Sequence, residues 1–351
     1  MSALRRVAAS PHLRGLLAVA VLIGLNLLKD PGYLSISYNA GRGALVGNLV
    51  DIARAAAPVL MVATGMCLVV ATKGIDLSVG SMMAVGGAVA MEYLSRAAAP
   101  TSLGAAAVAV LLALGLCAVL GLINGMLVAY VGLQPFITTL VMMLAGRGVA
   151  KVITGGQNRT ATNDKFRWIA NGYVFGLPVV ALIAVVVALL VALVVRRTAL
   201  GMLVEAIGIN PVASRLAGIN GRGLLVTVYI VSAVLGGVAG LMATGSVMTV
   251  DVSQTGYQLE LDAILAVVIG GTSLAGGKFS LGGAALGALL IATLDKTVVF
   301  LGVPSSATPA FKAAVIIVIY LIQSGRLGAV AGAARGRLRR EHARPAAEGV
   351  A

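Results

Sequence analysis

The side chains that could do chemistry are few, and none of them forms a set with catalytic spacing. Both histidines, His12 and His342, lie near the chain ends, and both cysteines, Cys67 and Cys117, lie inside apolar runs. That placement argues against a disulfide framework and leaves no grouping with the spacing of a metal site. No phosphate-binding loop and no set of nucleophile, base and orienting residue is recognisable. We therefore expect no catalytic site, no metal and no cofactor in this chain.

A second group of polar side chains has the chemistry that binds uncharged polar solutes. Amides, hydroxyls and an aromatic ring suit such solutes better than fixed charges do. The sequence offers them at Asn124, Gln134, Phe136, Thr138 and Thr139, around a Gln-Pro step that frees backbone groups at a helix start. We expect some of these residues to line a path for a solute. Hydrogen bonds between packed helices are an equally good explanation.

Carboxylates next to apolar runs are a third group, and a charge within a membrane is a functional candidate by default. Asp76 lies two residues before a helix expected to begin near Ser78, so its plainest role is to cap that helix and complement its dipole. Glu260 and Asp262 open the apolar run 259–275, where they can cap a helix or face a solute or a partner protein.

The elements that must position these residues are membrane helices. The chain is 59% hydrophobic and only 11% charged, with a mean hydropathy of +1.02. The apolar runs lack the alternation of a β-barrel, so they predict an all-α membrane protein with about ten transmembrane helices. The predicted spans lie near residues 14–28, 55–72, 78–95, 103–130, 135–153, 178–195, 223–245, 259–275, 280–300 and 310–323.

The basic residues predict the orientation of these spans. Fifteen of the 26 lysines and arginines fall in segments that share one side if the N-terminus is cytoplasmic. The positive-inside rule then places both termini and the loop 196–222 in the cytoplasm. We divide the chain into a cytoplasmic tail (1–14), a transmembrane domain (15–324) and a basic, disordered cytoplasmic tail (325–351). Membrane lipid, and not nucleic acid, is the acidic partner expected for the net charge of +14.

Two glycine-rich joints predict helices that are interrupted within the membrane. Irregular backbone at that depth is tolerated only inside protein or beside water. Both joints follow a Val-Val pair, which suggests a faint internal repeat. The joint residues are Gly74, Asp76, Ser78 and Gly80 in the first, and Gly270, Gly271, Thr272 and Ser273 in the second.

The polar loop 154–177 is expected on the opposite, outer side, where a partner protein can dock. Gln157 and Trp168 belong to this loop, and Arg147 precedes it by about two helical turns. Arg147 and Lys151 share one helix face, and their alternative role is to reach lipid head groups. Trp168 can equally be an anchor at the membrane surface.

The cytoplasmic loop 196–222 predicts two short helices, the second capped by Asn210 with Pro211 in its first turn. A compact helical loop of this kind is suited to a groove on a partner protein.

Several motifs in order resemble the permease subunit of bacterial ABC sugar importers of the ribose type, from about residue 50 to 324. They are Gly74 to Ser81, Asn124-Gly125 with Gln134 to Leu140, Gly146 to Gly148, Glu205 to Ala213, and Leu261 to Gly277. Within that family, the sequences of two segments, Leu144 to Gln157 and Leu259 to Asp262, are most similar to galactofuranose-type permeases.

The resemblance implies an inner-membrane subunit that pairs with a second permease, identical or related. ABC ATPase subunits would bind the ATP and Mg, and a periplasmic sugar-binding protein would deliver the cargo. By the family pattern, the residues coupled to the ATPase are Glu205, Ala206, Gly208, Asn210, Pro211 and Gly218. The alternative function is an ion-coupled secondary transporter, for which Asp295, Asp76 and Asp262 would be the first residues to examine.

Overall fold

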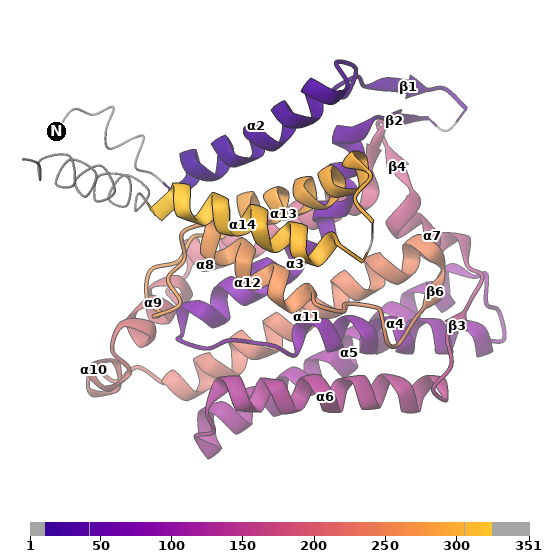
Figure 1. Ribbon diagram of the computed structural model, residues 1–351. Helices are drawn as coiled ribbons and strands as arrows, with labels where there is room; N and C mark the ends of the chain where they lie inside the picture. The colour runs from indigo at the N-terminus through magenta and orange to yellow at the C-terminus, as the bar shows by residue number, and fades with distance from the viewer. Residues whose placement is uncertain (1–10, 42, 305, 325–351) are drawn as a thin grey trace, which may run out of the picture.

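The structure is a computed structural model that describes residues 11–41, 43–304 and 306–324. These residues form a bundle of helices with three small pairs of strands (Figure 1). The helices are α2 (Pro11–Lys29), α3 (Asn48–Ala71), α4 (Val79–Arg96), α5 (Leu103–Met126), the π-helical turn η1 (Leu127–Val131), α6 (Pro135–Thr154), α7 (Asp164–Asn171), α8 (Val179–Arg197), α9 (Leu200–Ile209), α10 (Pro211–Leu216), α11 (Gly221–Val247), α12 (Leu259–Ile269), α13 (Leu281–Leu301) and α14 (Thr308–Ser324). The strands are β1 (Ser37–Asn39), β2 (Ala44–Val46), β3 (Arg159–Thr160), β4 (Tyr173–Val174), β5 (Leu177–Pro178) and β6 (Thr249–Val250).

The helical membrane architecture predicted from composition is confirmed. Within the described residues, six helices are long and apolar enough to cross a membrane: α3, α5 with η1, α6, α8, α11 and α13. Every predicted span overlaps one of the helices, but α2, α4, α12 and α14 are not among these six. The total of about ten spans therefore stays a prediction.

Local signals in the sequence explain several helix boundaries. Ser102 and Ser280 begin α5 and α13, where their hydroxyl oxygens accept backbone N–H groups, each at 3.0 Å. Gly155 and Gly302 end α6 and α13 with φ of 65° and 77°, a left-handed conformation that favours glycine. These capped ends fix where the chain leaves each helix.

The centre of the bundle is α11, which packs against α3, α4 and α5. Close approach is possible because glycines lie at the crossings, as is common between membrane helices. A methyl group added to Gly121 of α5 would lie 2.6 Å from the Cβ of Ala233 on α11, and one added to Gly125 would lie 2.7 Å from the Cα of Val226. The small residues of these spans therefore belong to helix contacts.

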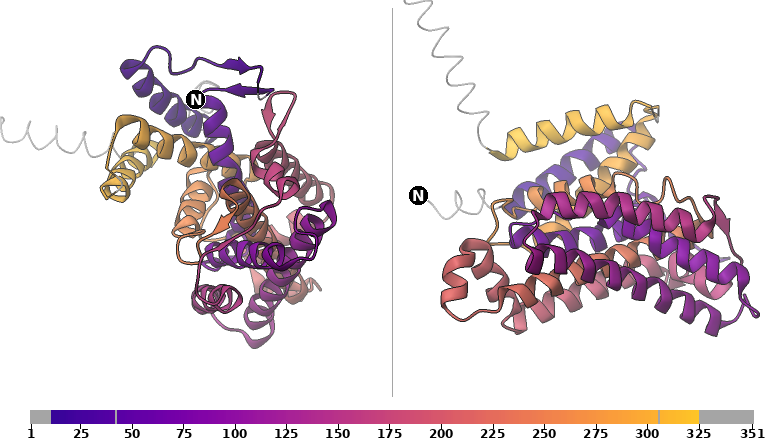
Figure 2. Two further views of the ribbon diagram at one scale, coloured as in Figure 1. Left: turned by 90° about the vertical axis from the view of Figure 1, so that its right-hand side faces the viewer. Right: turned by 90° about the horizontal axis from the view of Figure 1, so that it is seen from below.

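The periphery of the bundle is apolar and exposed, as expected of surfaces that face lipid. Leu111 of α5, Leu144 of α6 and Leu189 of α8 all extend away from the core. On another side, α2 and α14 pack on α13 (Figure 2).

The two ends of the bundle differ in structure. At one end lie α9 and α10, and α2 begins and α14 ends at this same end (Figure 1). The opposite end carries α7 and the strand pairs β1–β2, β3–β6 and β4–β5, all antiparallel. This arrangement agrees with termini on one side of the membrane, although which side is cytoplasmic stays a prediction. Of the predicted tails, residues 1–10 and 325–351 lie outside the described residues, and α2 already begins at Pro11.

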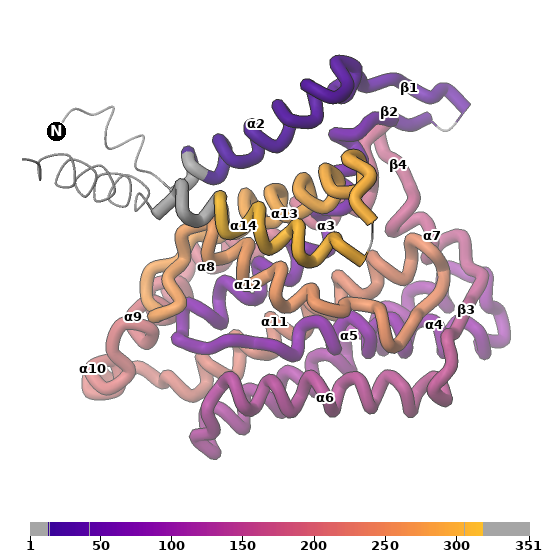
Figure 3. The backbone as a smooth tube through the Cα atoms, in the orientation of Figure 1, coloured from indigo at the N-terminus to yellow at the C-terminus, as the bar shows by residue number. Residues whose placement is uncertain are grey.

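Two connections interrupt the helical pattern inside the bundle. After α3 ends, residues 72–78 run back into the bundle before α4 begins (Figure 3). The second follows α12, which has only 11 residues and ends at Ile269, earlier than the predicted residue 275, and it runs over residues 270–280 to the start of α13. The starts of α4 and α12 meet, because Gly80 faces the side chain of Glu260 and the backbone of Gly256.

Candidate functional site

The first joint, residues 72–78, is held by a buried polar cluster. One carboxylate oxygen of Asp76 accepts the N–H and the hydroxyl of Ser78 at 3.0 and 2.5 Å, and the other accepts the Ser232 hydroxyl at 2.8 Å. Asn124 donates to the Ser78 hydroxyl oxygen at 3.0 Å. All four residues are buried. The N-cap residue of α4 is Ser78, so Asp76 is not the cap that the sequence predicts, and it links the joint to α11 instead.

The remaining path candidates divide between this joint and the outside of the bundle. Thr139 is buried and donates to the carbonyl of Ile75 at 2.9 Å, whereas Thr138 bonds within its own helix to Gln134. Gln134 and Phe136 are exposed at the start of α6. The structure thus brings Asn124 and Thr139 together at the joint. A role for any of the five residues in solute passage stays a prediction.

The second joint, residues 270–280, is also closed by local contacts. The hydroxyl oxygen of Thr272 accepts the N–H of Ser280 at 3.1 Å and lies 3.6 Å from the Cys67 sulfur. Gly270 packs against the backbone of Gly283, and Gly271 has φ of 92°. Ser273 is exposed and accepts a backbone N–H two residues further along.

Helices α9 and α10 form an arm, residues 200–216, that touches both joints. The ammonium group of Lys73 donates to the carbonyl of Ile209 at 3.2 Å. Gly208 lies in a gap where an added methyl would collide with the Ala71 carbonyl and lie 2.5 Å from the Gly277 nitrogen. Only glycine fits this contact, so the end of α9 is wedged between the two interrupted segments.

The arm has the local structure that its sequence predicts. Asn210 caps α10 by accepting the N–H groups of Val212 and Ala213, each at 3.0 Å, and Pro211 occupies the first turn, which confirms that prediction. Glu205 and Ala206 are half-buried, and Gly218 has φ of 81° after α10 ends. Glu205 also lines a cavity of about 390 Å³ with Arg196 and Phe279 among others.

Sequence reasoning missed the apolar surface of the arm. Four apolar side chains of the arm are between 63% and 86% exposed: Met202, Ile209, Val212 and Leu216. The sequence did contain a signal for this surface, because these residues are apolar although the loop 196–222 is expected to lie in water. Such a surface is typical of a site that a partner protein covers.

The start of α12 carries two carboxylates in different environments. Glu260 faces Gly80, and one of its carboxylate oxygens is buried without a hydrogen-bond partner. Asp262 instead forms an ion pair with Lys312 of α14 at 2.9 Å, and Lys312 also contacts Asp295 of α13 at 2.9 Å. This triad joins three helices, and the sequence analysis did not single out Lys312.

Arg147 does not reach outward in the way its predicted alternative requires. Its guanidinium donates to the carbonyls of Val252 and Thr255 at 3.2 and 2.6 Å, so it holds the loop that leads to α12. In the same loop, Asp251 accepts the N–H groups of Ser253 and Gln254, and these bonds lower the pKa of its carboxyl. Two sets of hydrogen bonds therefore hold the first part of this loop.

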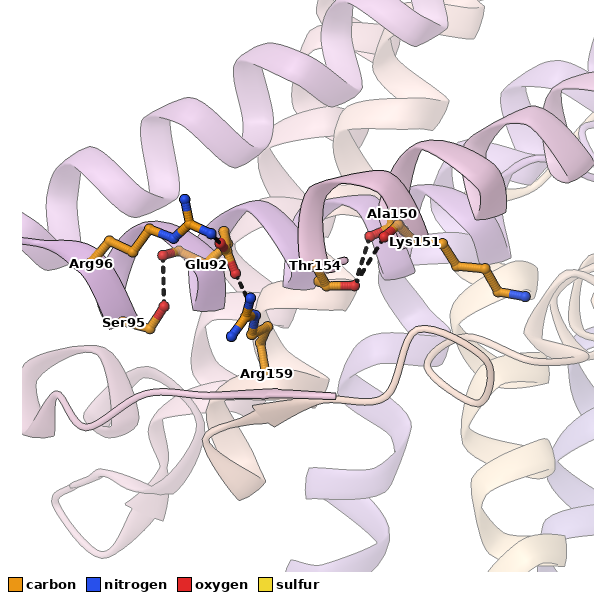
Figure 4. Close-up of polar contacts among 7 residues, drawn as sticks. All are labelled: Glu92, Ser95, Arg96, Ala150, Lys151, Thr154 and Arg159. Atoms are coloured by element: carbon orange, nitrogen blue, oxygen red, sulfur yellow. Dashed lines mark hydrogen bonds and ion pairs between the residues drawn. The ribbon is translucent and has the colours of Figure 1, made fainter. Parts of the chain in front are cut away.

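A second ion cluster joins α4 to strand β3 at that end of the bundle. Glu92, near the end of α4, pairs with Arg96 at 2.5 Å and with Arg159 of β3 at 2.8 Å (Figure 4). Lys151 points away from this cluster in the same view. Gln157 and Trp168 are exposed at this end, as a docking surface or a membrane anchor would require.

The arrangement is mechanical in character. Among the described residues no group of three or more His, Cys, Asp or Glu side chains could hold a metal ion. The structure contains two joints between helices, and these joints contact each other and the protruding arm. A force on the arm would therefore reach both connections.

The chain belongs to a family of membrane transport permeases. Residues 48–321 match the family model described as branched-chain amino acid transport system / permease component. More specifically, the chain belongs to the permeases of ABC sugar importers of the ribose and galactofuranose type, and so is a multi-pass inner-membrane protein.

Three relatives show the range of the similarity. The chain is 49% identical to the fructose import permease of Bifidobacterium longum over 316 residues. These residues are 89% of this chain and 87% of the relative. The galactofuranose transporter permease of Escherichia coli is 40% identical, with 92% of each chain covered. The ribose import permease of the same species is 37% identical, with 89% and 93% covered. No solved structure matches the chain significantly.

Proposed function

We propose that this chain moves a monosaccharide, a pentose or a hexose, from the periplasm to the cytoplasm. Partner ATPase subunits would bind ATP and Mg and supply the energy, a periplasmic sugar-binding protein would deliver the sugar, and a second permease subunit would complete the path. Membership of the sugar-importer permeases supports the proposal. The observation that carries it is the arm, because its Gly208 is wedged between the two interrupted connections.

Fructose is the first sugar to test, followed by galactofuranose and ribose. The relatives named for these sugars are 49%, 40% and 37% identical to the chain, respectively. Sequence identity over most of the chain therefore does not favour galactofuranose, the sugar that the two short segments suggested.

We assign the arm to the cytoplasm, together with both termini, in a fold of about ten spans. Arg196, Arg197, Arg215 and Arg222 lie in or next to the arm, and the positive-inside rule favours this orientation. The exposed apolar side chains of Met202, Ile209, Val212 and Leu216 would contact the ATPase. Movement of the ATPase would then displace the end of α9 and, with it, both joints.

For the path itself, we propose the region where the starts of α4 and α12 meet. Helix starts inside a membrane present the positive end of the helix dipole and free N–H groups, which suit sugar oxygens. Glu260 supplies a carboxylate oxygen there that lacks a partner among the described residues. Gln134, Phe136 and the joint residues complete the candidate lining on neighbouring elements.

The experiment that tests the proposal measures ATP hydrolysis by the co-purified complex of this chain and the ATPase encoded beside it. Binding protein from the same gene cluster is added empty or loaded with each sugar. We expect stimulation by one loaded form, and loss of that stimulation when Glu205 to Gly218 is replaced by a flexible linker of equal length. An absence of any co-purifying ATPase, with uptake that follows an ion gradient, would show a secondary transporter instead.

A further inference from the structure

A second pocket of about 580 Å³ lies at the arm end of the bundle, and none of its lining residues belongs to either joint. It is bounded by the end of η1, by α10 and by the start of α11. Its lining residues are Val128, Ala129, Tyr130, Gly132, Ile207, Pro211, Ser214, Arg215, Ile219, Asn220, Gly221, Arg222 and Leu225.

The pocket is positively charged. Arg215 and Arg222 line it, and no aspartate or glutamate does. Within the described part of the chain, neither guanidinium has a carboxylate within ion-pair distance, whereas Arg96, Arg159 and Lys312 all do. Arg222 lies over the ring of Tyr130, with its guanidinium carbon 5.7 Å from the ring centre. Two unpaired arginines facing one cavity make a site for an anion.

The position of the pocket relates it to the membrane surface. Leu103–Val131 and Gly221–Val247 are both long and apolar enough to be spans, and the pocket lies where the first ends and the second begins. Its wall includes Val128, Ile207 and Leu225, and the neighbouring Val131 is 64% exposed. A cavity lined by both basic and apolar residues, at the end of two spans, is complementary to an amphiphilic ligand.

We propose that this pocket binds the phosphate head group of an anionic phospholipid. The arginines would share the phosphate oxygens, and Ser214 and Asn220 would offer polar contacts beside them. The apolar wall would receive the glycerol and the first part of the acyl chains. A free phosphate ion satisfies the arginines equally well but leaves the apolar wall exposed to water, and so the lipid is the better fit.

The ligand would join two elements that otherwise share few contacts. Arg215 belongs to α10 of the arm, and Arg222 belongs to the first turn of α11, the central helix. A bound head group would therefore tie the arm to the membrane surface. This inference concerns a lipid site and does not depend on the identity of the sugar or of the ATPase.

The test measures lipid retention by the full-length chain in detergent micelles, using native mass spectrometry with phosphatidylglycerol and phosphatidylcholine. We expect preferential retention of phosphatidylglycerol, and a weakening of its binding by about thirtyfold in the double variant Arg215→Gln/Arg222→Gln. The matched control is Arg196→Gln/Arg197→Gln, which removes the same charge at the same end of the bundle and should retain the lipid. Arg215→Lys/Arg222→Lys keeps the charge and should retain most of the binding.

Three outcomes would overturn the proposal. Equal retention of both lipids would show that the head-group charge is not recognised. An equal loss in the control pair would show general attraction to a basic surface. Displacement of the lipid by inorganic phosphate at millimolar concentration, with phosphate protecting the chain from thermal unfolding in lipid-free detergent, would show a site for a soluble anion. Thermal unfolding of each variant verifies that it is folded before its lipid binding is compared.

Discussion

The backbone N–H of Gly277 donates to the carbonyl oxygen of Ala71 at 2.8 Å, which ties the joint after α12 directly to the last residue of α3. The same carbonyl faces Gly208 of the arm. Three segments that are far apart in the sequence thus meet at one peptide group. A displacement of any one of them would therefore disturb its contacts with the other two.

Replacing Gly208 with alanine should disconnect the arm from the joints. The added methyl would collide with the Ala71 carbonyl, and backbone cannot yield as a flexible side chain can. We expect the protein to lose most sugar-stimulated ATP hydrolysis in the assembled complex, together with some thermal stability.

The matched control is Gly148→Ala on α6, because an added methyl there meets no atom within 4 Å. This variant should be neutral or slightly stabilising, since alanine favours a helix more than glycine does. Normal stimulated hydrolysis in Gly208→Ala would show that the arm does not transmit motion through this contact.

Replacing Asp76 with alanine should destabilise the first joint strongly. The Ser232 hydroxyl, the Ser78 hydroxyl and the Ser78 N–H would all lose their acceptor in a buried site. Unsatisfied buried donors cost about 1–3 kcal/mol each, so the melting temperature in detergent should fall clearly. Ser232→Ala removes one of these bonds and should cost less. A melting temperature equal to that of the unmodified protein would contradict the assignment of Asp76 to structure.

The ion triad predicts a rescue experiment. Lys312→Met leaves Asp262 and Asp295 without their cation in a partly buried site, which should cost on the order of 1–2 kcal/mol, between the values for exposed and for buried pairs. The triple variant Lys312→Met/Asp262→Asn/Asp295→Asn removes the charges together and should recover much of that stability. Unfolding temperatures in one detergent give the comparison. Failure of the triple variant to improve on Lys312→Met would show that the charges are not the source of the loss.

The exposed surface of the arm predicts a loss of partner binding without a loss of folding. Val212→Ser/Leu216→Ser changes two side chains that are 65% and 86% exposed, so it should alter the unfolding free energy by less than about 0.5 kcal/mol per site. Co-purification of the ATPase should nevertheless fall sharply. Phe175→Ser is the control, because that residue is 98% exposed at the opposite end of the bundle. Undiminished recovery of the ATPase with the double variant would place its contact elsewhere.

Most of the long helices were predictable because their apolar runs are long enough to cross a membrane. Sequence spacing also predicted the cap at Asn210, since a cap is a contact between near neighbours in the chain. The end of α12 was predicted too late, at residue 275, because the run stays apolar beyond Ile269. What ends that helix is the packing of Gly270 against Gly283 together with the positive φ of Gly271, and neither follows from hydropathy.

The candidate site was less predictable because its contacts are long-range. Asn124 and Thr139 stand out in the sequence as polar residues within apolar runs, but their partners, Ser78 and Ile75, lie on a different segment. The role of Lys312 was not predicted, because a single lysine in an apolar run is usually explained by contact of its ammonium group with lipid head groups. Only the packing of α12, α13 and α14 shows that it meets two carboxylates.

The central position of α11 also has a consequence for biosynthesis. Its partners α3, α4 and α5 are made first, yet the glycine surfaces that they present to α11 stay uncovered until Gly221–Val247 has been translated and inserted. During that interval these glycine-lined surfaces of α3, α4 and α5 are exposed to lipid or to the insertion machinery. Chains truncated before α11 should therefore be captured by membrane quality-control proteases, whereas chains truncated after it should escape them.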